Sequence, residues 1–232
     1  MPPLRALPPA VVTIDGPAGA GKTSVARSLA ERLGYVLLDS GALYRAVAFV
    51  ALERAVGLED DEALERIATV LSIRFEPAEG SQRCWVDGRD VTAAIRTPRI
   101  SEAASRISAR PGVRTALLGL QRKIAEHRGV VAEGRDMGTV VFPDAPVKFF
   151  LIASAEERAR RRTHQLSQSG VEAPSEAQVR EEQEVRDRRD SEREVAPLRP
   201  ATDAVVVDTT ALSEDEVIEG LERRVIDVLC RT

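Results

Sequence analysis

Residues 11–24 read VVTIDGPAGAGKTS and predict a strand, a glycine-rich loop and the start of a helix. Residues 11–14 form a short β-branched apolar run, which is typical of a strand buried on both faces of a parallel sheet. Residues 16–23 then match the pattern G-x-x-x-x-G-K-[ST], and residues 24–33 have a helical composition. This pattern is informative only between a strand and a helix, and the flanking residues predict both.

The loop and the helix behind it predict a site for the phosphates of a nucleoside triphosphate. Glycines allow main-chain N–H groups to turn inward and to approach phosphate oxygens at the helix N-terminus. The Lys22 ammonium can reach the β- and γ-phosphates, and the Thr23 hydroxyl can bind Mg²⁺. The expected nucleotide-binding residues are Gly16, Pro17, Ala18, Gly19, Ala20, Gly21, Lys22, Thr23 and Ser24.

The composition is that of an ordinary globular protein. A chain of 232 residues is long enough for one α/β domain with insertions. The net charge of -4 predicts no general attraction to nucleic acid or to an anionic membrane. No apolar run approaches the roughly 18 residues of a membrane span, and the proline-rich start lacks a signal-peptide core. We therefore expect a cytoplasmic protein with a flexible tail at residues 1–10, without nucleic-acid or membrane partners.

Strand-like and helix-like segments alternate along most of the chain. Strands are expected at residues 11–14, 35–38, 129–132, 147–152 and 204–207, with helices between them. This alternation predicts a parallel, right-handed α/β sheet. Residues 39–41 are expected to form a turn at a strand end, before a helix at residues 42–55. Residues 72–76 and 82–87 alternate between apolar and polar residues around turns, which predicts a small antiparallel insert.

A phosphate loop alone does not distinguish a kinase from a GTPase switch or a motor ATPase. The chain contains no asparagine and so lacks the N-K-x-D motif that reads guanine. The short length and the insert favour a small kinase with a second nucleotide site. That site should be rich in arginine, because the acceptor carries its own phosphate. Candidates are Arg45 and Arg135, which follow strand ends, and Arg186, Arg188, Arg189 and Arg193.

The late arginines belong to a densely charged segment. Residues 156–193 contain nine arginines and ten acidic residues. Such a pattern is typical of a solvated pair of helices held by salt bridges. It also suits a mobile lid, because phosphoryl transfer needs the charge on the γ-phosphoryl oxygens neutralised while water is excluded.

Four stretches of this chain resemble bacterial cytidylate kinases: residues 16–24, LLDSGALYR at 37–45, GRDMGTVVFPDAPVKFFL at 134–151, and RDRRDSEREVAPL at 186–198. The resemblance extends over nearly the whole chain beyond the tail, and GRDMGTVVFPDA is highly specific to that family. It implies transfer of the γ-phosphoryl group of ATP to CMP or dCMP, giving ADP and CDP or dCDP. The cofactors it implies are ATP, as the phosphoryl donor, and Mg²⁺.

The resemblance also implies an architecture. The fold class that it implies for this chain is α/β. The expected fold is a P-loop kinase fold with a five-stranded parallel sheet flanked by helices. An antiparallel subdomain that binds the nucleoside monophosphate (NMP) is inserted at residues 72–97. The core then comprises residues 11–71 and 98–232, with a short lid at roughly residues 156–185. The enzyme is expected to be a monomer that takes the small molecules CMP or dCMP and ATP.

The resemblance assigns roles to single side chains. The expected substrate-binding residues are Ser40, Arg45, Ser105, Arg114, Arg135, Asp136, Arg186 and Asp190. Among these, Ser105, Arg114 and Asp136 match positions that contact cytosine. Arg135 is expected to reach the phosphate, and Arg186 and Asp190 the sugar. The expected catalytic residues are Lys22, Arg135, Arg186 and Arg193. Thr23 is the expected Mg²⁺ ligand, with Ser24 as the alternative, because the family often has Gly after the loop lysine.

The cytosine assignment also makes chemical sense. Cytosine offers an amino donor at N4 and acceptors at N3 and O2, so Asp136 can accept from the amino group and Arg114 can donate to the acceptors. Uracil would instead place a carbonyl against the Asp136 carboxylate. Three alternatives stay open: Asp136 as a helix cap or salt-bridge residue, a kinase for another small acceptor, and a non-catalytic nucleotide-dependent switch.

Overall fold

The computed structural model describes residues 7–78, 81–168 and 174–230. The chain forms two compact units. The first comprises Met1–Leu38 and Ala125–Thr232, and the second comprises Asp39–Ile124.

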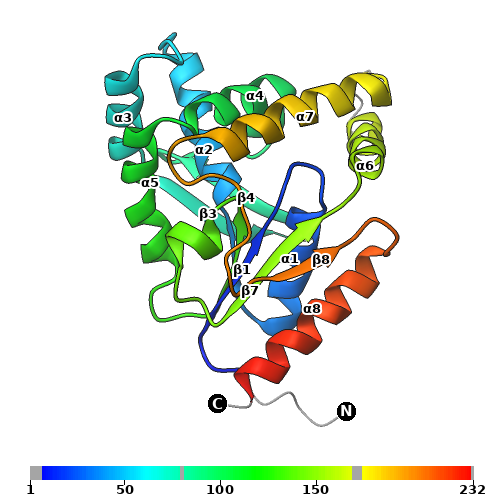
Figure 1. Ribbon diagram of the computed structural model, residues 1–232. Helices are drawn as coiled ribbons and strands as arrows, with labels where there is room; N and C mark the ends of the chain where they lie inside the picture. The colour runs from blue at the N-terminus through cyan, green and yellow to red at the C-terminus, as the bar shows by residue number, and fades with distance from the viewer. Residues whose placement is uncertain (1–6, 79–80, 169–173, 231–232) are drawn as a thin grey trace. The chain divides into compact units, whose positions relative to one another are not determined.

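The first unit is built on a five-stranded parallel sheet with the strand order β2-β6-β1-β7-β8 (Figure 1). Its strands are β1 (Val11–Asp15), β2 (Val36–Asp39), β6 (Val130–Gly134), β7 (Val147–Ile152) and β8 (Val205–Asp208). Val12 of the central strand β1 pairs in parallel with Val131 on one side and Val147 on the other. Each predicted strand agrees with an observed one to within two residues, and the predicted fold class is confirmed.

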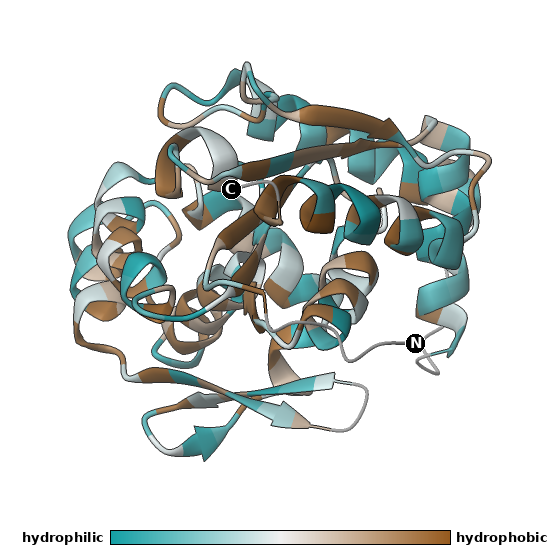
Figure 2. Ribbon diagram, turned by 90° about the horizontal axis from the view of Figure 1, so that it is seen from below, coloured by the Kyte–Doolittle hydropathy of each residue, from teal (hydrophilic) through white to brown (hydrophobic). Residues whose placement is uncertain are grey.

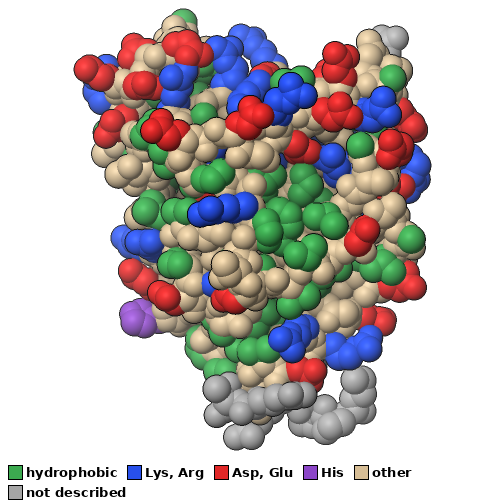
Figure 3. Space-filling model, viewed as in Figure 1, with side chains coloured by type: hydrophobic (Ala, Val, Ile, Leu, Met, Phe, Trp, Pro, Cys, Tyr) green, Lys and Arg blue, Asp and Glu red, His purple; other side chains and the backbone are tan. Residues whose placement is uncertain are grey.

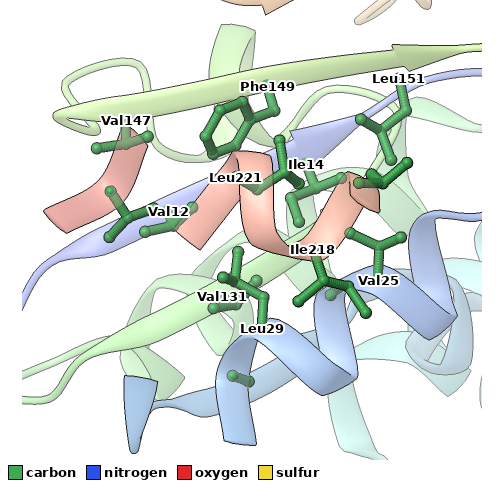
Figure 4. Packing of buried hydrophobic residues seen from close by; sticks show 14 of the residues in the cluster. Val12, Ile14, Val25, Leu29, Val131, Val147, Phe149, Leu151, Ile218 and Leu221 are labelled. Carbon is green, nitrogen blue, oxygen red and sulfur yellow. The ribbon is translucent and has the colours of Figure 1, made fainter. Parts of the chain in front are cut away.

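The described residues of the first unit form four helices: α1 (Lys22–Leu33), α6 (Ala155–Gln168), α7 (Glu176–Glu192) and α8 (Glu214–Leu229). Two of them, α1 and α8, cover one face of the sheet. Leu29 of α1 and Leu221 of α8 pack with Val12, Ile14 and Phe149 of the strands in one buried cluster (Figure 4). Burial of this apolar surface is the main force that holds the phosphate loop at the end of β1.

The second unit is mostly helical and carries a small antiparallel sheet. Its helices are α2 (Ser40–Glu53), α3 (Asp61–Val70), α4 (Pro98–Ile107) and α5 (Pro111–Ile124), with a 3₁₀ turn η1 (Ala94–Arg96). Its strands are β3 (Ile73–Ala78), β4 (Ser81–Val86) and β5 (Arg89–Asp90), in that order. Hydrophilic and hydrophobic residues mix along this sheet (Figure 2). The antiparallel insert predicted from the sequence is confirmed, and β5 adds a strand that was not predicted.

Two segments that follow strand ends are helical, and the first of them was predicted as a turn. Residues 39–41 do not form a turn, because helix α2 begins at Ser40 and Asp39 caps it. The Asp39 carboxylate accepts a hydrogen bond from the Ala42 N–H at 2.8 Å, which satisfies an amide at the helix start. The segment after β6 forms a wide helical turn of the π type, η2 (Met137–Val141).

The predicted domain limits stay a prediction. The expected insert at residues 72–97 lies inside the second unit, and the expected lid coincides with α6 and most of α7. Residues 169–173 of the lid and residues 1–6 of the tail lie outside the described residues. Further along the expected tail, Leu7 and Ala10 pack against the core of the first unit.

Acidic and basic side chains are interspersed on the molecular face drawn in Figure 3. Within the described part of the chain, no helix combines the length and the apolar character needed to cross a membrane.

Candidate functional site

The phosphate loop leaves β1 at a position that only glycine fits. Gly16 has φ +147°, and a Cβ atom there would lie 2.1 Å from the carbonyl oxygen of Leu151 on β7. Helix α1 begins six residues later at Lys22, after Gly21, which has no side chain to cap it. The amides at the start of α1 are therefore not taken by a cap at Gly21, as an anion site at a helix N-terminus requires.

Lys22 is held inside the loop. Its side chain is buried, with 5% of the residue exposed, and its Nζ donates to the carbonyl oxygen of Pro17 at 2.6 Å. Burial lowers the pKa of Lys22 to about 7, and the positive charge of Arg135 acts in the same direction. A lysine in this state gains strongly from an arriving phosphate, because burial outweighs the nearby charges of Glu133 and Asp187 and the phosphate adds a further counter-charge.

Thr23, the predicted metal ligand, lies beside an acid. Its Oγ1 donates to Glu133 Oε1 at 2.7 Å, which links α1 to the end of β6. A hydroxyl and a carboxylate are the hard oxygen ligands that Mg²⁺ prefers, and this ion usually keeps several waters and adds phosphate oxygens. The described residues contain no group of three or more His, Cys, Asp or Glu side chains suited to a metal. The pair therefore fits Mg²⁺ bound together with a nucleotide.

Helices α6 and α7 both contact the phosphate loop. The Ala18 N–H donates to Asp187 Oδ1 at 3.0 Å, and Arg158 Nη1 donates to the Ala18 carbonyl oxygen at 3.0 Å. Arg158 also pairs with the Asp187 carboxylate. In this arrangement a side-chain carboxylate occupies a loop amide that the sequence predicts for a phosphate oxygen.

The segment after β6 gathers several of the predicted site residues. Arg135 Nε donates to Asp190 Oδ2 at 2.9 Å, and Arg193 Nη2 lies 3.5 Å from Asp136 Oδ1. Burial alone would raise the pKa of Asp190, but the charges of Arg135, Arg186 and Arg193 hold it below its ordinary value. Asp136 is 3% exposed and Asp190 is 3% exposed, so both carboxylates lie in surroundings where charge interactions are strong.

Asp15, the last residue of β1, binds the segment that follows β6 through two main-chain amides. Its two carboxylate oxygens accept hydrogen bonds from the N–H groups of Met137 at 2.9 Å and Gly138 at 2.8 Å. Burial raises the pKa of Asp15 to about 6, although both main-chain hydrogen bonds oppose the shift.

The remaining predicted residues lie in the second unit. Ser40 is buried at the start of α2, and Arg45 one turn later pairs with Asp39 at 2.8 Å. Ser105 is buried on α4. Arg114 on α5 donates to the Ser108 carbonyl oxygen at 3.1 Å, and its guanidinium lies 5.7 Å from the Tyr44 ring centre.

The predicted residues thus divide between the two units of the fold. Lys22, Thr23, Arg135, Asp136, Arg186, Asp190 and Arg193 belong to the first unit, and Ser40, Arg45, Ser105 and Arg114 belong to the second. Their individual roles stay predictions.

Sequence reasoning did not single out Asp15, Glu133 or Asp187. Asp15 could have been noticed, because it is a charged residue that ends an apolar strand beside the phosphate loop. Glu133 gave a similar signal, because it is a charged residue one position before the end of the apolar strand β6. Asp187 gave no signal, because it stands in a helix in which most residues are charged.

The comparison with known proteins agrees with these features. The family model of cytidylate kinases matches residues 12–226. The cytidylate kinase of Pseudomonas aeruginosa is 53% identical over 215 residues, covering 92% of this chain and 93% of that protein. The cytidylate kinase of Klebsiella pneumoniae is 51% identical over 209 residues, covering 90% and 92%. The cytidylate kinase of Pasteurella multocida is 50% identical over 208 residues, covering 90% and 91%. This chain belongs to the cytidylate kinase family.

Proposed function

We propose that this protein transfers the γ-phosphoryl group of ATP to CMP or dCMP, giving ADP and CDP or dCDP. The observation that carries the proposal is the placement of two features in the first unit. The phosphate loop with its buried Lys22 follows β1, and the buried Asp136 follows β6, which pairs with β1. The carboxyl ends of parallel strands are where such sheets bind their ligands.

The donor half of the reaction uses the loop. The main-chain N–H groups at the start of α1 bind the phosphates, and Lys22 adds a positive charge to the transferring group. For ATP to bind, a phosphate oxygen takes the place of the Asp187 carboxylate at the Ala18 amide. Arg135, Arg186 and Arg193 supply further positive charge for the transfer.

Thr23 and Glu133 would hold Mg²⁺ through oxygen ligands, directly or through water, and Ser24 is the alternative hydroxyl. When bound, the ion neutralises charge on the transferring phosphoryl group. Thr23 and Glu133 already make a 2.7 Å hydrogen bond, so the two oxygens stand close together before any ion arrives.

The acceptor half of the reaction requires that the enzyme recognise the acceptor base and align the acceptor phosphate for attack. The acceptor phosphate is already an anion and needs no general base, so this chain can act without a catalytic histidine. Asp136 accepts a hydrogen bond from the cytosine amino group, and Arg114 and Ser105 contact the ring. Arg45 and Arg135 are assigned to the phosphate, and Asp190 and Arg186 to the sugar. We further propose that the enzyme works as a monomer in the cytoplasm.

An acceptor panel tests the proposal. CMP, dCMP, UMP, AMP and GMP are each offered with ATP and Mg²⁺, and ADP release is followed with a coupled assay. We expect fast turnover with CMP or dCMP and slow turnover with the others. A different preferred acceptor would make the protein a kinase of another specificity. ATP binding without acceptor-dependent ADP release would contradict catalysis and favour a switch.

A further inference from the structure

The wide turn η2 begins with two amides that need partners. The first N–H groups of a helical segment have no partner within the segment, and a side chain just before it usually accepts them. Here the residue before the turn is Asp136, a good capping residue. Asp136 nevertheless makes no capping hydrogen bond to the turn with its side chain. Its main-chain carbonyl accepts from the Val140 and Val141 N–H groups, at 2.9 and 3.1 Å.

Asp15 supplies the cap from another strand. Its oxygens accept the Met137 and Gly138 N–H groups at 2.9 and 2.8 Å, one oxygen for each amide. Asp15 is 4% exposed, so water does not compete strongly for these amides. A carboxylate facing the N-terminal end of a helical turn is also favoured by the turn's dipole.

The turn is packed closely against β1 at the same place. A Cβ atom on Gly138 would lie 2.9 Å from Thr13 Oγ1 and 3.5 Å from Asp15 Oδ2, so a larger residue would force the turn away from the strand. The absence of a side chain at residue 138 thus lets the amide come within reach of Asp15.

We propose that Asp15 is a positioning residue for base recognition, which caps η2 in place of Asp136 and leaves the Asp136 carboxylate oriented for the acceptor base. This inference rests on the proposed function, in which Asp136 accepts from the cytosine amino group. If the Asp15 cap is lost, the Asp136 carboxylate can turn toward the unsatisfied amides, because the residue directly before a helical turn is the usual capping residue. Discrimination between cytosine and uracil should then weaken, although Asp136 itself is still present.

The Asp15→Asn variant tests this directly. Asparagine has nearly the same shape, but only one of its two terminal atoms can accept a hydrogen bond, so one turn amide loses its partner. We expect the ratio of kcat/KM for CMP to kcat/KM for UMP to fall by about tenfold. The KM for ATP should change by less than about threefold, because the loop amides and Lys22 are intact.

A double-mutant cycle separates positioning from general damage. In an Asp136→Ala background, the Asp15→Asn change should alter the CMP-to-UMP ratio by less than about twofold, because the residue through which Asp15 acts is absent. Thr13→Val is the matched control on the same strand. The Thr13 Oγ1 is buried without a hydrogen-bond partner in the described structure, so this change should leave the ratio within about twofold of wild type.

The possible outcomes differ clearly. A folded Asp15→Asn enzyme with an unchanged ratio would overturn this inference and leave the proposed function intact. A wild-type protein that shows no CMP-dependent ADP release would overturn the proposed function itself. If Asp15→Asn does not fold, hydrogen exchange in the wild-type protein decides. The capped amides of Met137 and Gly138 should then be protected as strongly as the β1 amides, and fast exchange at both would overturn the inference.

Discussion

At the scale of single residues, the site is a set of charged groups that have lost water and compensate one another. Lys22 lacks a close carboxylate among its hydrogen-bond partners, and its pKa is lowered to about 7 by burial and by Arg135. Asp190 differs from Lys22, because its charge is already compensated. Arg135 and neighbouring arginines lower its pKa and keep it ionised. The lysine is therefore the group in this site whose charge depends most on the arrival of a phosphate.

Replacement of the loop lysine should separate activity from stability. In Lys22→Met we expect turnover to fall by at least about a hundredfold, because a transition-state charge contact is lost. The melting temperature at pH 7 should not fall, because a buried amine that opposes folding is replaced by an apolar chain of similar length. Steady-state kinetics and a thermal melt measure both effects. Turnover close to wild type would contradict the role of Lys22.

The lowered pKa of Lys22 predicts proton uptake on nucleotide binding. At pH 8 the amine is mostly neutral in the ligand-free protein, and the bound phosphates raise its pKa, so the complex takes up close to one proton. Calorimetric titration of ATP in two buffers of different ionisation enthalpy measures this number. Lys22→Met is the control and should lose the uptake. An uptake of zero in the wild-type protein would show that Lys22 is already charged.

Loss of the Asp136 carboxylate should make the enzyme less selective. In wild type, uracil places a carbonyl against a buried carboxylate, at a cost of about 1.5–3 kcal/mol. This corresponds to roughly 10- to 150-fold discrimination between CMP and UMP. Asp136→Ala should remove most of this factor, as measured by relative kcat/KM. An unchanged ratio would leave Asp136 as a structural salt-bridge residue.

At the scale of elements, the sheet and the helices could be predicted because their signals are local. A β-branched run such as residues 11–14 predicts a strand wherever it lies, and all five strands were found to within two residues. The start of α2 was missed because residues 39–41 favour turns and helix caps equally, and only the Asp39–Ala42 hydrogen bond decides between them. The Asp15 cap joins residues 122 and 123 positions apart, a contact that no local pattern reports.

The contact of α7 with the phosphate loop predicts competition between a carboxylate and a phosphate. Asp187 accepts the Ala18 N–H, so nucleotide binding must break this hydrogen bond. In Asp187→Ala we expect ATP to bind about two- to tenfold more tightly, because that cost is removed. Glu184→Ala, an exposed acid on the same helix, is the control and should leave the affinity unchanged. Weaker binding in Asp187→Ala would show that Asp187 supports the nucleotide.

At the scale of the whole molecule, the oligomeric state can be predicted, and we expect a monomer. The exposed large hydrophobic residues are scattered over several elements: Val70, Val185, Val195, Val205, Val206 and Leu212. Among these, only Val205 and Val206 are adjacent in the sequence, and successive residues of a strand point to opposite faces. We expect sedimentation velocity to give one species of 25.2 kDa at about micromolar concentration. A species of twice that mass would contradict the prediction.

The two groups of predicted site residues could be named from the sequence, but their partners could not. The motifs locate Lys22, Asp136 and the arginines, because each stands in a segment with a recognisable pattern. The contacts that tune them involve Asp187, Glu133 and Asp15, which come from distant segments and depend on the packing of the sheet and of α7. The structure therefore adds mainly the electrostatic surroundings of residues that the sequence already indicated.

A crystal structure with CMP and a non-hydrolysable ATP analogue bound together tests the proposed site most directly. We expect the amino group of the cytosine to lie within about 3.2 Å of an Asp136 carboxylate oxygen. We also expect the triphosphate to lie against the amides of residues 18–23, with the Ala18–Asp187 hydrogen bond broken. A pyrimidine ring bound away from residues 134–138 would show that Asp136 does not read the base.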